Sequence, residues 1–185
     1  MLRTSSFIYL SILALVAAVI NEAVGWTEAR VWLLLVWAVL LLPVSIGLLG
    51  HPMRAPALGL FVGVWGTLAV VVLIVLQALA IAGVLGAEWT AAPLAVLGVW
   101  FAVASLLGFG ADPFPAVVDV LGVLTGAGFI AIGAATMVGD SAVLRAAGLV
   151  AAVAYVLWAA GLGWVFWSMR SPLRSFRGMA VEPRA

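Results

Sequence analysis

The chain has 185 residues, of which 67% are hydrophobic and 8% are charged, and its formal net charge is +1. These few polar side chains cannot cover a water-facing globule, so the composition excludes an ordinary soluble domain and indicates a membrane protein. The near-neutral charge excludes the basic face that nucleic-acid binding requires, and the absence of cysteine excludes disulfides, thiol catalysis and cysteine-ligated metals.

Six apolar stretches follow one another along the chain, and each is long enough to cross a bilayer as a helix rising about 1.5 Å per residue. We predict spans over residues 7–24, 31–49, 55–85, 91–109, 116–138 and 142–169. The expected fold is all-α: a polytopic integral membrane protein built as a six-transmembrane-helix bundle. Residues 1–170 form the membrane domain, and residues 171–185 form a short polar cytoplasmic tail.

Short breaks rich in glycine, proline or polar residues separate the spans. Thr27 and the turn at residues 139–141 each offer a side chain that can cap the following helix. Pro43 falls inside the second span and predicts a kink, because its ring frees a backbone carbonyl that neighbouring helices can satisfy. Each half of the chain has two ordinary spans and one long span, as in the inverted repeats of transporters, but the halves do not align residue by residue.

The arginines indicate which side of the membrane each end of the bundle faces, since cytoplasmic segments carry an excess of basic residues. An even number of spans puts both termini on one side. The segments on that side hold six of the eight arginines: Arg3, Arg54, Arg170, Arg174, Arg177 and Arg184. The outer links and helix ends hold Arg30 and Arg145. We therefore predict cytoplasmic N and C termini in a multi-pass protein of the inner or plasma membrane.

Gln77 is the one strongly polar side chain well inside a span, about eight residues or roughly 12 Å from the predicted outer end of the third span. It can bind a ligand in an outward-facing cavity together with Glu22, Glu88 or Arg145. The alternative is a hydrogen bond to a neighbouring helix, which a buried amide side chain commonly makes in a membrane.

Several tryptophans lie far from the predicted interfaces, where the aromatic belts of membrane proteins gather. Because a buried indole N–H usually finds a polar partner, these residues can line an aromatic pocket for an apolar or planar small molecule. The candidates for that pocket are Trp65, Trp100 and Trp158, with Trp37 at similar depth. The alternative is that they fill the space between helices.

A second set of polar residues is predicted at the cytoplasmic end: His51 and Arg54 lie at that end of the third span, and Asp112 and Asp119 lie before and in the fifth. Together they can form a gate or a proton-handling cluster, since histidine titrates near neutral pH. Alternatively they are separate interface charges that stay solvated, with Arg54 anchoring its loop and Asp119 favouring a helix N-terminus.

The sequence offers little for catalysis or for cofactors. It has a single histidine, no metal-ligand spacing such as H-E-x-x-H, and no serine in a G-x-S-x-G context. We predict no catalytic residue, no metal and no cofactor. The pairs Gly59-x-x-x-Gly63 and Gly122-x-x-x-Gly126 permit close helix approach, either for folding or for dimerisation.

Three classes of function stay open. The favoured one is a non-enzymatic binding or accessory role with a protein partner or a lipid-like ligand, because the spans carry almost no polar groups. The alternatives are a small-solute permease or substrate-binding membrane subunit of a transporter, and an intramembrane enzyme acting on a lipid or isoprenoid. Expected partners are the lipid bilayer, a membrane protein or second copy of the chain, and an apolar small molecule, but no nucleic acid.

Overall fold

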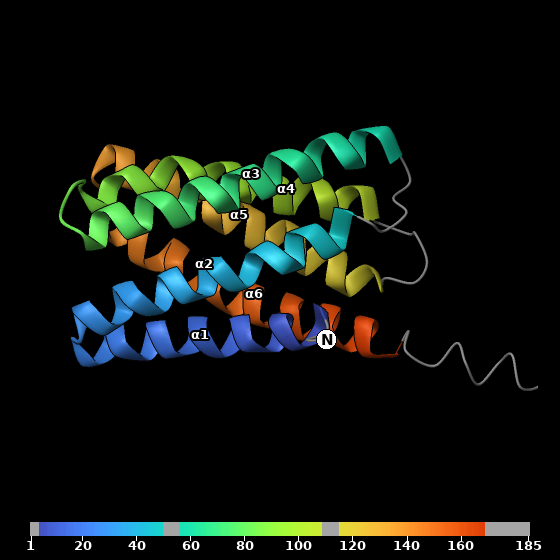
Figure 1. The fold of residues 1–185 in the computed structure, drawn as a ribbon, viewed down its shortest axis with the longest axis horizontal. Coiled ribbons are helices and arrows are strands. Elements are labelled where there is room, and N and C mark those ends of the chain that lie inside the picture. The colour runs from blue at the N-terminus through green and yellow to red at the C-terminus, as the bar shows by residue number, and fades with distance from the viewer. Residues whose placement is uncertain (1–3, 50–55, 109–114, 169–185) are drawn as a thin grey trace, which may run out of the picture.

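The computed structural model describes residues 4–49, 56–108 and 115–168, which are helical apart from the turns that join them (Figure 1). The helices are α1 (Thr4–Val24), α2 (Thr27–Leu49), α3 (Pro56–Ile81), the short 3-10 helix η1 (Ala87–Thr90), α4 (Ala91–Gly108), α5 (Ala116–Val138) and α6 (Ser141–Ser168). In this described part, the six α-helices are each long and apolar enough to span a membrane. The all-helical class and the six candidate spans are therefore confirmed.

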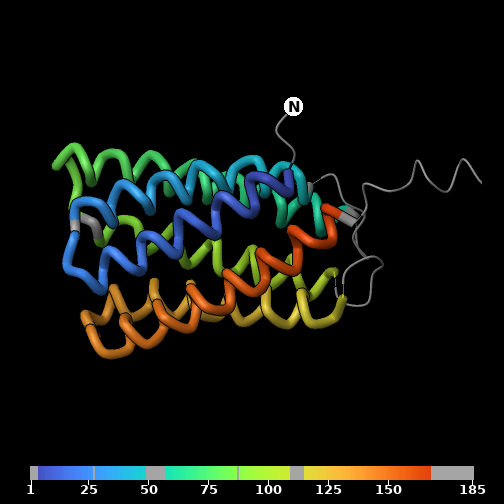
Figure 2. The backbone as a smooth tube through the Cα atoms, turned by 90° about the horizontal axis from the view of Figure 1, so that it is seen from below, coloured from blue at the N-terminus to red at the C-terminus, as the bar shows by residue number. Residues whose placement is uncertain are grey.

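The six long helices pack in a cycle: each packs against the next along the chain, and α6 closes the cycle against α1 (Figure 2). The connections after α1, α3 and α5 lie together at one end of the bundle, opposite the end where α1 begins (Figure 1). We call this the turn end. It is the end that the distribution of arginines predicts to face away from the cytoplasm.

Glycine ends each of the three helices whose C-termini lie at the turn end. Gly25, Gly83 and Gly139 have left-handed backbones, with φ of 84°, 72° and 77°, a conformation that glycine adopts without steric penalty. Directly after Gly139, Oδ1 of Asp140 accepts the backbone N–H groups two and three residues later, at 2.9 and 3.0 Å, and caps α6. The helix cap predicted in the turn at residues 139–141 is confirmed.

The third predicted span is too long at its C-terminal end. We expected it to reach Leu85, but α3 ends at Ile81. The N–H groups of Gly83 and Val84 turn back to the carbonyls three and five residues earlier, at 3.1 and 2.9 Å, which closes the helix in a Schellman motif. Residues 82–85 carry no polar side chain, so the apolar stretch continues where the backbone turns.

α2 begins at Thr27, earlier than the predicted Val31, and continues through Pro43 to Leu49 without interruption. The kink expected at Pro43 stays a prediction. The side chain of Thr27 lies outside the described residues, so its role as a helix cap stays a prediction too.

α4 and α5 approach each other closely enough for their backbones to touch. A Cβ on Gly98 would lie 2.6 Å from the carbonyl oxygen of Gly126, and a Cβ on Gly126 would collide with the carbonyl oxygen of Gly98. Further along, a Cβ on Gly133 would lie 2.8 Å from Cβ of Ala95. We call this contact the α4–α5 seam. Gly122 also faces α4, so the Gly122-x-x-x-Gly126 pair serves packing within the chain.

The centre of the bundle is filled by an aromatic cluster made of Trp37, Trp100, Phe101, Phe129, Tyr155 and Trp158. Phe101 lies in its middle, with ring centroids 4.8 Å from Trp158 and 5.6 Å from Phe129. Trp37 of α2 closes the group, 5.6 Å from Tyr155 in an edge-on arrangement. Rings from α2, α4, α5 and α6 therefore pack into one core.

The outer surface of the bundle is apolar along its length. Leu13, Phe61 and Leu149 are 65%, 60% and 62% exposed, which a water-soluble protein of this size would avoid. Apart from Trp65 of α3, the exposed tryptophans lie toward the two ends, with Trp26 at the turn end and Trp167 near the end of α6. This distribution fits helices that face lipid along their middle and headgroups at their ends.

Candidate functional site

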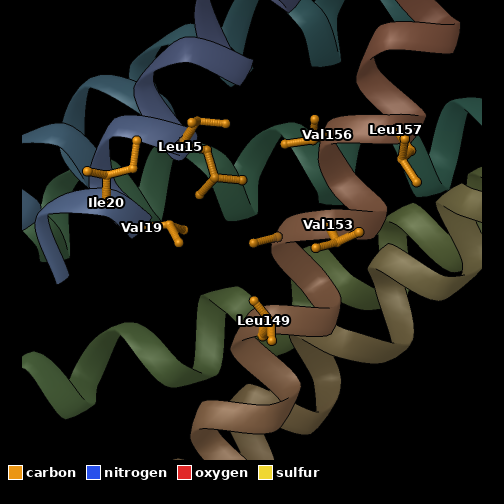
Figure 3. A pocket seen from close by; sticks show the side chains of 9 residues that line it. Leu15, Val19, Ile20, Leu149, Val153, Val156 and Leu157 are labelled. Carbon is orange, nitrogen blue, oxygen red and sulfur yellow. The ribbon is translucent and has the colours of Figure 1, made fainter. Parts of the chain in front are cut away.

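An apolar crevice separates α1 from α6 on the side of the turn end (Figure 3). It has a volume of about 290 Å³, and every side chain that lines it is aliphatic. The lining residues are Leu15, Val16, Val19 and Ile20 from α1 and Leu149, Ala152, Val153, Val156 and Leu157 from α6. We call this space the α1–α6 crevice.

The base of the crevice is where α1 and α6 touch. The hydroxyls of Ser11 and Tyr155 are 2.6 Å apart, and Ser11 donates its own proton to the carbonyl of Ile8 at 2.7 Å, so Tyr155 is the donor to Ser11. Further from the turn end, α6 comes close to α1 at Gly163, where a Cβ would lie 2.9 Å from the ring of Tyr9. From these contacts the two helices separate toward the turn end.

The crevice is open to the side, and its length along the helix axes is about that of one membrane leaflet. Leu15 at its base is 7% exposed, whereas Val19, Val153 and Leu149 are 40%, 52% and 62% exposed. The helix rise from Leu149 to Leu157 is about 12 Å, compared with about 15 Å for half of a hydrocarbon core of about 30 Å. A molecule in this space therefore has protein on two sides and the lipid phase on a third.

Comparison with other proteins gives no further guide to the site. No family model, no curated protein and no solved structure matches this chain. The geometry and chemistry of the bundle are the basis for a functional proposal.

Charged side chains lie beyond the crevice at the turn end. Arg145 precedes Leu149 by one helical turn, is exposed, and donates from Nε to the carbonyl of Ser141 at 3.2 Å. Glu22, near the end of α1, forms an ion pair with Arg30 of α2, with 2.6 Å between Oε2 and Nη1. Two of the residues predicted to share an outward cavity, Glu22 and Arg145, thus belong to the two helices that form the crevice.

Gln77 lies elsewhere, between α2 and α3. Its Nε2 donates to the carbonyl of Val31 at 3.2 Å, so the hydrogen bond to a neighbouring helix that the sequence allows is present. Because α3 ends at Ile81, Gln77 is four residues or about 6 Å from the helix end, rather than the expected 12 Å. α3 is opposite α6 in the cycle of helices, so Gln77 and Arg145 are not brought together. Glu88 lies exposed in η1, and a ligand role for Gln77 or Glu88 stays a prediction.

The tryptophans predicted to line a pocket separate into two groups. Trp100 and Trp158 are 3% and 5% exposed and belong to the aromatic cluster, where they fill the space between helices. Trp65 is 51% exposed on α3, beside Phe61, and faces away from that cluster. Ligand binding by these residues stays a prediction.

The indole N–H of Trp37 is buried and has no hydrogen-bond partner in the described part of the chain.

Asp119, in the first turn of α5, is buried rather than solvated. It is 5% exposed, and its Oδ2 has no hydrogen-bond partner among the residues that the structure describes. Gly108 makes room for the carboxylate, since a Cβ there would lie 3.0 Å from Oδ1. The expectation that this charge stays solvated at the interface is therefore wrong. The other members of the predicted cytoplasmic cluster, His51, Arg54 and Asp112, lie outside the described residues, so the cluster stays a prediction.

The residues that line the crevice were not predicted to form a site. Aliphatic side chains give the same sequence signal whether they face lipid, a packed core or a crevice. One available signal is the spacing of Arg145, Leu149, Val153 and Val156, which places a charge and three aliphatic residues on one face of α6. The matching face of α1 and the gap between the two helices appear only in the fold.

Proposed function

We propose that this chain is a non-enzymatic, multi-pass membrane protein that holds a lipid acyl chain in the α1–α6 crevice, in a binding or accessory role. The observation that carries the proposal is the crevice itself, which is aliphatic throughout, open to the side and about one leaflet deep. Burial of apolar surface drives little association within a bilayer, because the lipid tails are equally apolar. Retention therefore comes from van der Waals contact with both walls.

The polar groups of the spans support a binding role over transport. Ser11, Thr67, Thr125 and Thr136 each donate to a carbonyl of their own helix. Permeases for ions and polar solutes present free polar groups near the middle of the membrane, and here the aromatic cluster occupies the centre of the described bundle. A permease and an intramembrane enzyme remain the alternatives.

The proposed location is an inner or plasma membrane, with the turn end outside and both termini in the cytoplasm. The excess of arginine in the segments at the other end supports this orientation. The crevice then opens into the outer leaflet.

Native mass spectrometry of the protein released gently from its own membranes tests the proposal, with one pair of variants. Val153 and Val150 are both exposed on α6, at 52% and 55%, but only Val153 lines the crevice. We expect wild type to carry one lipid per chain, Val153→Trp to lose it several-fold by filling the space, and Val150→Trp to keep it. Wild type without lipid, or a bound protein partner in its place, would contradict the proposal.

A further inference from the structure

Arg145 continues the crevice-lining face of α6 toward the turn end. Leu149, Val153 and Val156 follow it by four, eight and eleven residues, and these spacings place side chains on one face of a helix. The rise from Arg145 to Leu157 is about 18 Å, so the guanidinium lies at the headgroup end of a crevice whose depth suits an acyl chain.

The side chain of Arg145 is directed toward that headgroup level. Its Nε bonds the carbonyl of Ser141, one turn closer to the start of α6, and long cationic side chains near helix ends extend in this way toward the membrane surface. The bond uses one of the five N–H donors of the guanidinium. The donors on its two terminal nitrogens remain to bind an anion, and a guanidinium binds phosphate oxygens in pairs.

The charges around the turn-end opening leave Arg145 without a counterion of its own. Glu22, the acidic residue nearest the crevice on α1, is paired with Arg30. Asp140, five residues before Arg145, keeps its negative charge while its Oδ1 caps α6, but no ion pair joins Arg145 to any carboxylate in the ranges that the structure describes. The opening of the crevice therefore has on α6 a positive charge that makes no ion pair, whereas Glu22 of α1 is neutralised by Arg30 of α2.

From this arrangement we infer that the crevice selects an anionic phospholipid of the leaflet at the turn end, whose phosphate binds Arg145 while one acyl chain lies between α1 and α6. The inference rests on the proposed function and adds the class of headgroup. A neutral lipid would fill the crevice equally well but would leave the charge on Arg145 without a net negative partner.

Lipid competition on the purified full chain tests the inference. The protein in detergent receives phosphatidylglycerol and phosphatidylcholine with identical acyl chains, and native mass spectrometry counts the lipid that each variant retains. We expect wild type to retain several times more phosphatidylglycerol than phosphatidylcholine. Arg145→Gln should bind both lipids at the phosphatidylcholine level, and Arg145→Lys should keep most of the preference because it keeps the charge.

The outcomes separate the two levels of the proposal. Equal retention of both lipids by wild type, or an unchanged preference in Arg145→Gln, would overturn the anionic headgroup and leave the acyl-chain site standing. Retention of neither lipid would overturn the proposed function itself. Val153→Trp should lose both lipids and Val150→Trp neither, and a preference that survives Val153→Trp would place the lipid outside the crevice.

Discussion

The α4–α5 seam and the α1–α6 crevice are both apolar, but small residues form the seam and mostly branched aliphatic residues line the crevice. Along the seam, Gly98 and Gly126 allow the carbonyl of each helix to lie against the other backbone. Along the crevice, branched side chains such as Val19 and Val153 line an open space between α1 and α6. Within the most apolar stretch of each helix, 44% of the residues of α4, α5 and α6 are buried inside the protein but only 28% of those of α1, so the lower burial beside the crevice belongs to α1.

The difference shows how, in a helix bundle within lipid, one pair of helices can stabilise the fold while another pair forms a binding site. Association of apolar helices in a bilayer depends on close packing rather than on escape from water, so a seam without side chains between its backbones contributes most to the fold. Where the helices separate, the aliphatic side chains between them contribute less to the fold and offer a surface that lipid can occupy. Glycine on α4 and α5 thus contributes to the stability of the fold, whereas valine on α1 and α6 contributes to the proposed lipid site.

The largest expected effect comes from breaking the seam. Gly126→Leu places a side chain against the carbonyl of Gly98 and the backbone N–H of Ala102. Overpacking costs about 1–3 kcal/mol and occasionally more, and we expect the upper part of this range because the contact is with backbone atoms: a large fall in thermal midpoint in detergent and loss of the monodisperse folded protein. Gly148→Leu on α6 is the matched control, since nothing lies within 4 Å of a Cβ there. An equal fall in thermal midpoint for both variants would show that close packing at the seam does not contribute more to stability than other positions.

A smaller effect should follow from loosening the base of the crevice. Ser11→Ala leaves the Tyr155 hydroxyl, which is fully buried, without its acceptor, and an unsatisfied buried hydroxyl costs about 1–3 kcal/mol. Tyr155→Phe removes the donor but leaves Ser11 bonded to Ile8, so it should cost less. Thermal unfolding of both variants in the same micelles measures the order. A more damaging Tyr155→Phe would mean that the hydrogen bond does not hold this contact.

The smallest effect is expected at Gln77, outside both regions. Gln77→Leu removes the hydrogen bond to Val31 while keeping a similar volume, and measured hydrogen bonds between membrane helices average about 0.6 kcal/mol. We expect a shift of the thermal midpoint close to the error of the measurement and no change in bound lipid. A loss of bound lipid in this variant would contradict this expectation and would show that Gln77 takes part in ligand binding.

The sequence predicts the six helices well because hydropathy reports directly on lipid contact. It misses the end of α3 because Gly83 lies in an apolar stretch, and the left-handed backbone there leaves no trace in hydropathy. It misses the burial of Asp119, because the contact of its carboxylate with Gly108 joins two different helices. The contact between Ser11 and Tyr155, which closes the base of the crevice, joins residues at opposite ends of the chain, so no local pattern predicts it.

The most direct test of the lipid site is photo-crosslinking with a phosphatidylglycerol that carries a diazirine in its acyl chain. One equivalent is added to the detergent-purified protein, and the labelled residues are mapped by mass spectrometry. We predict adducts concentrated on the crevice walls, at residues such as Val19 and Val153. Labelling spread evenly over the exposed apolar surface, including Phe61 and Val64 of α3, would contradict a lipid site between α1 and α6.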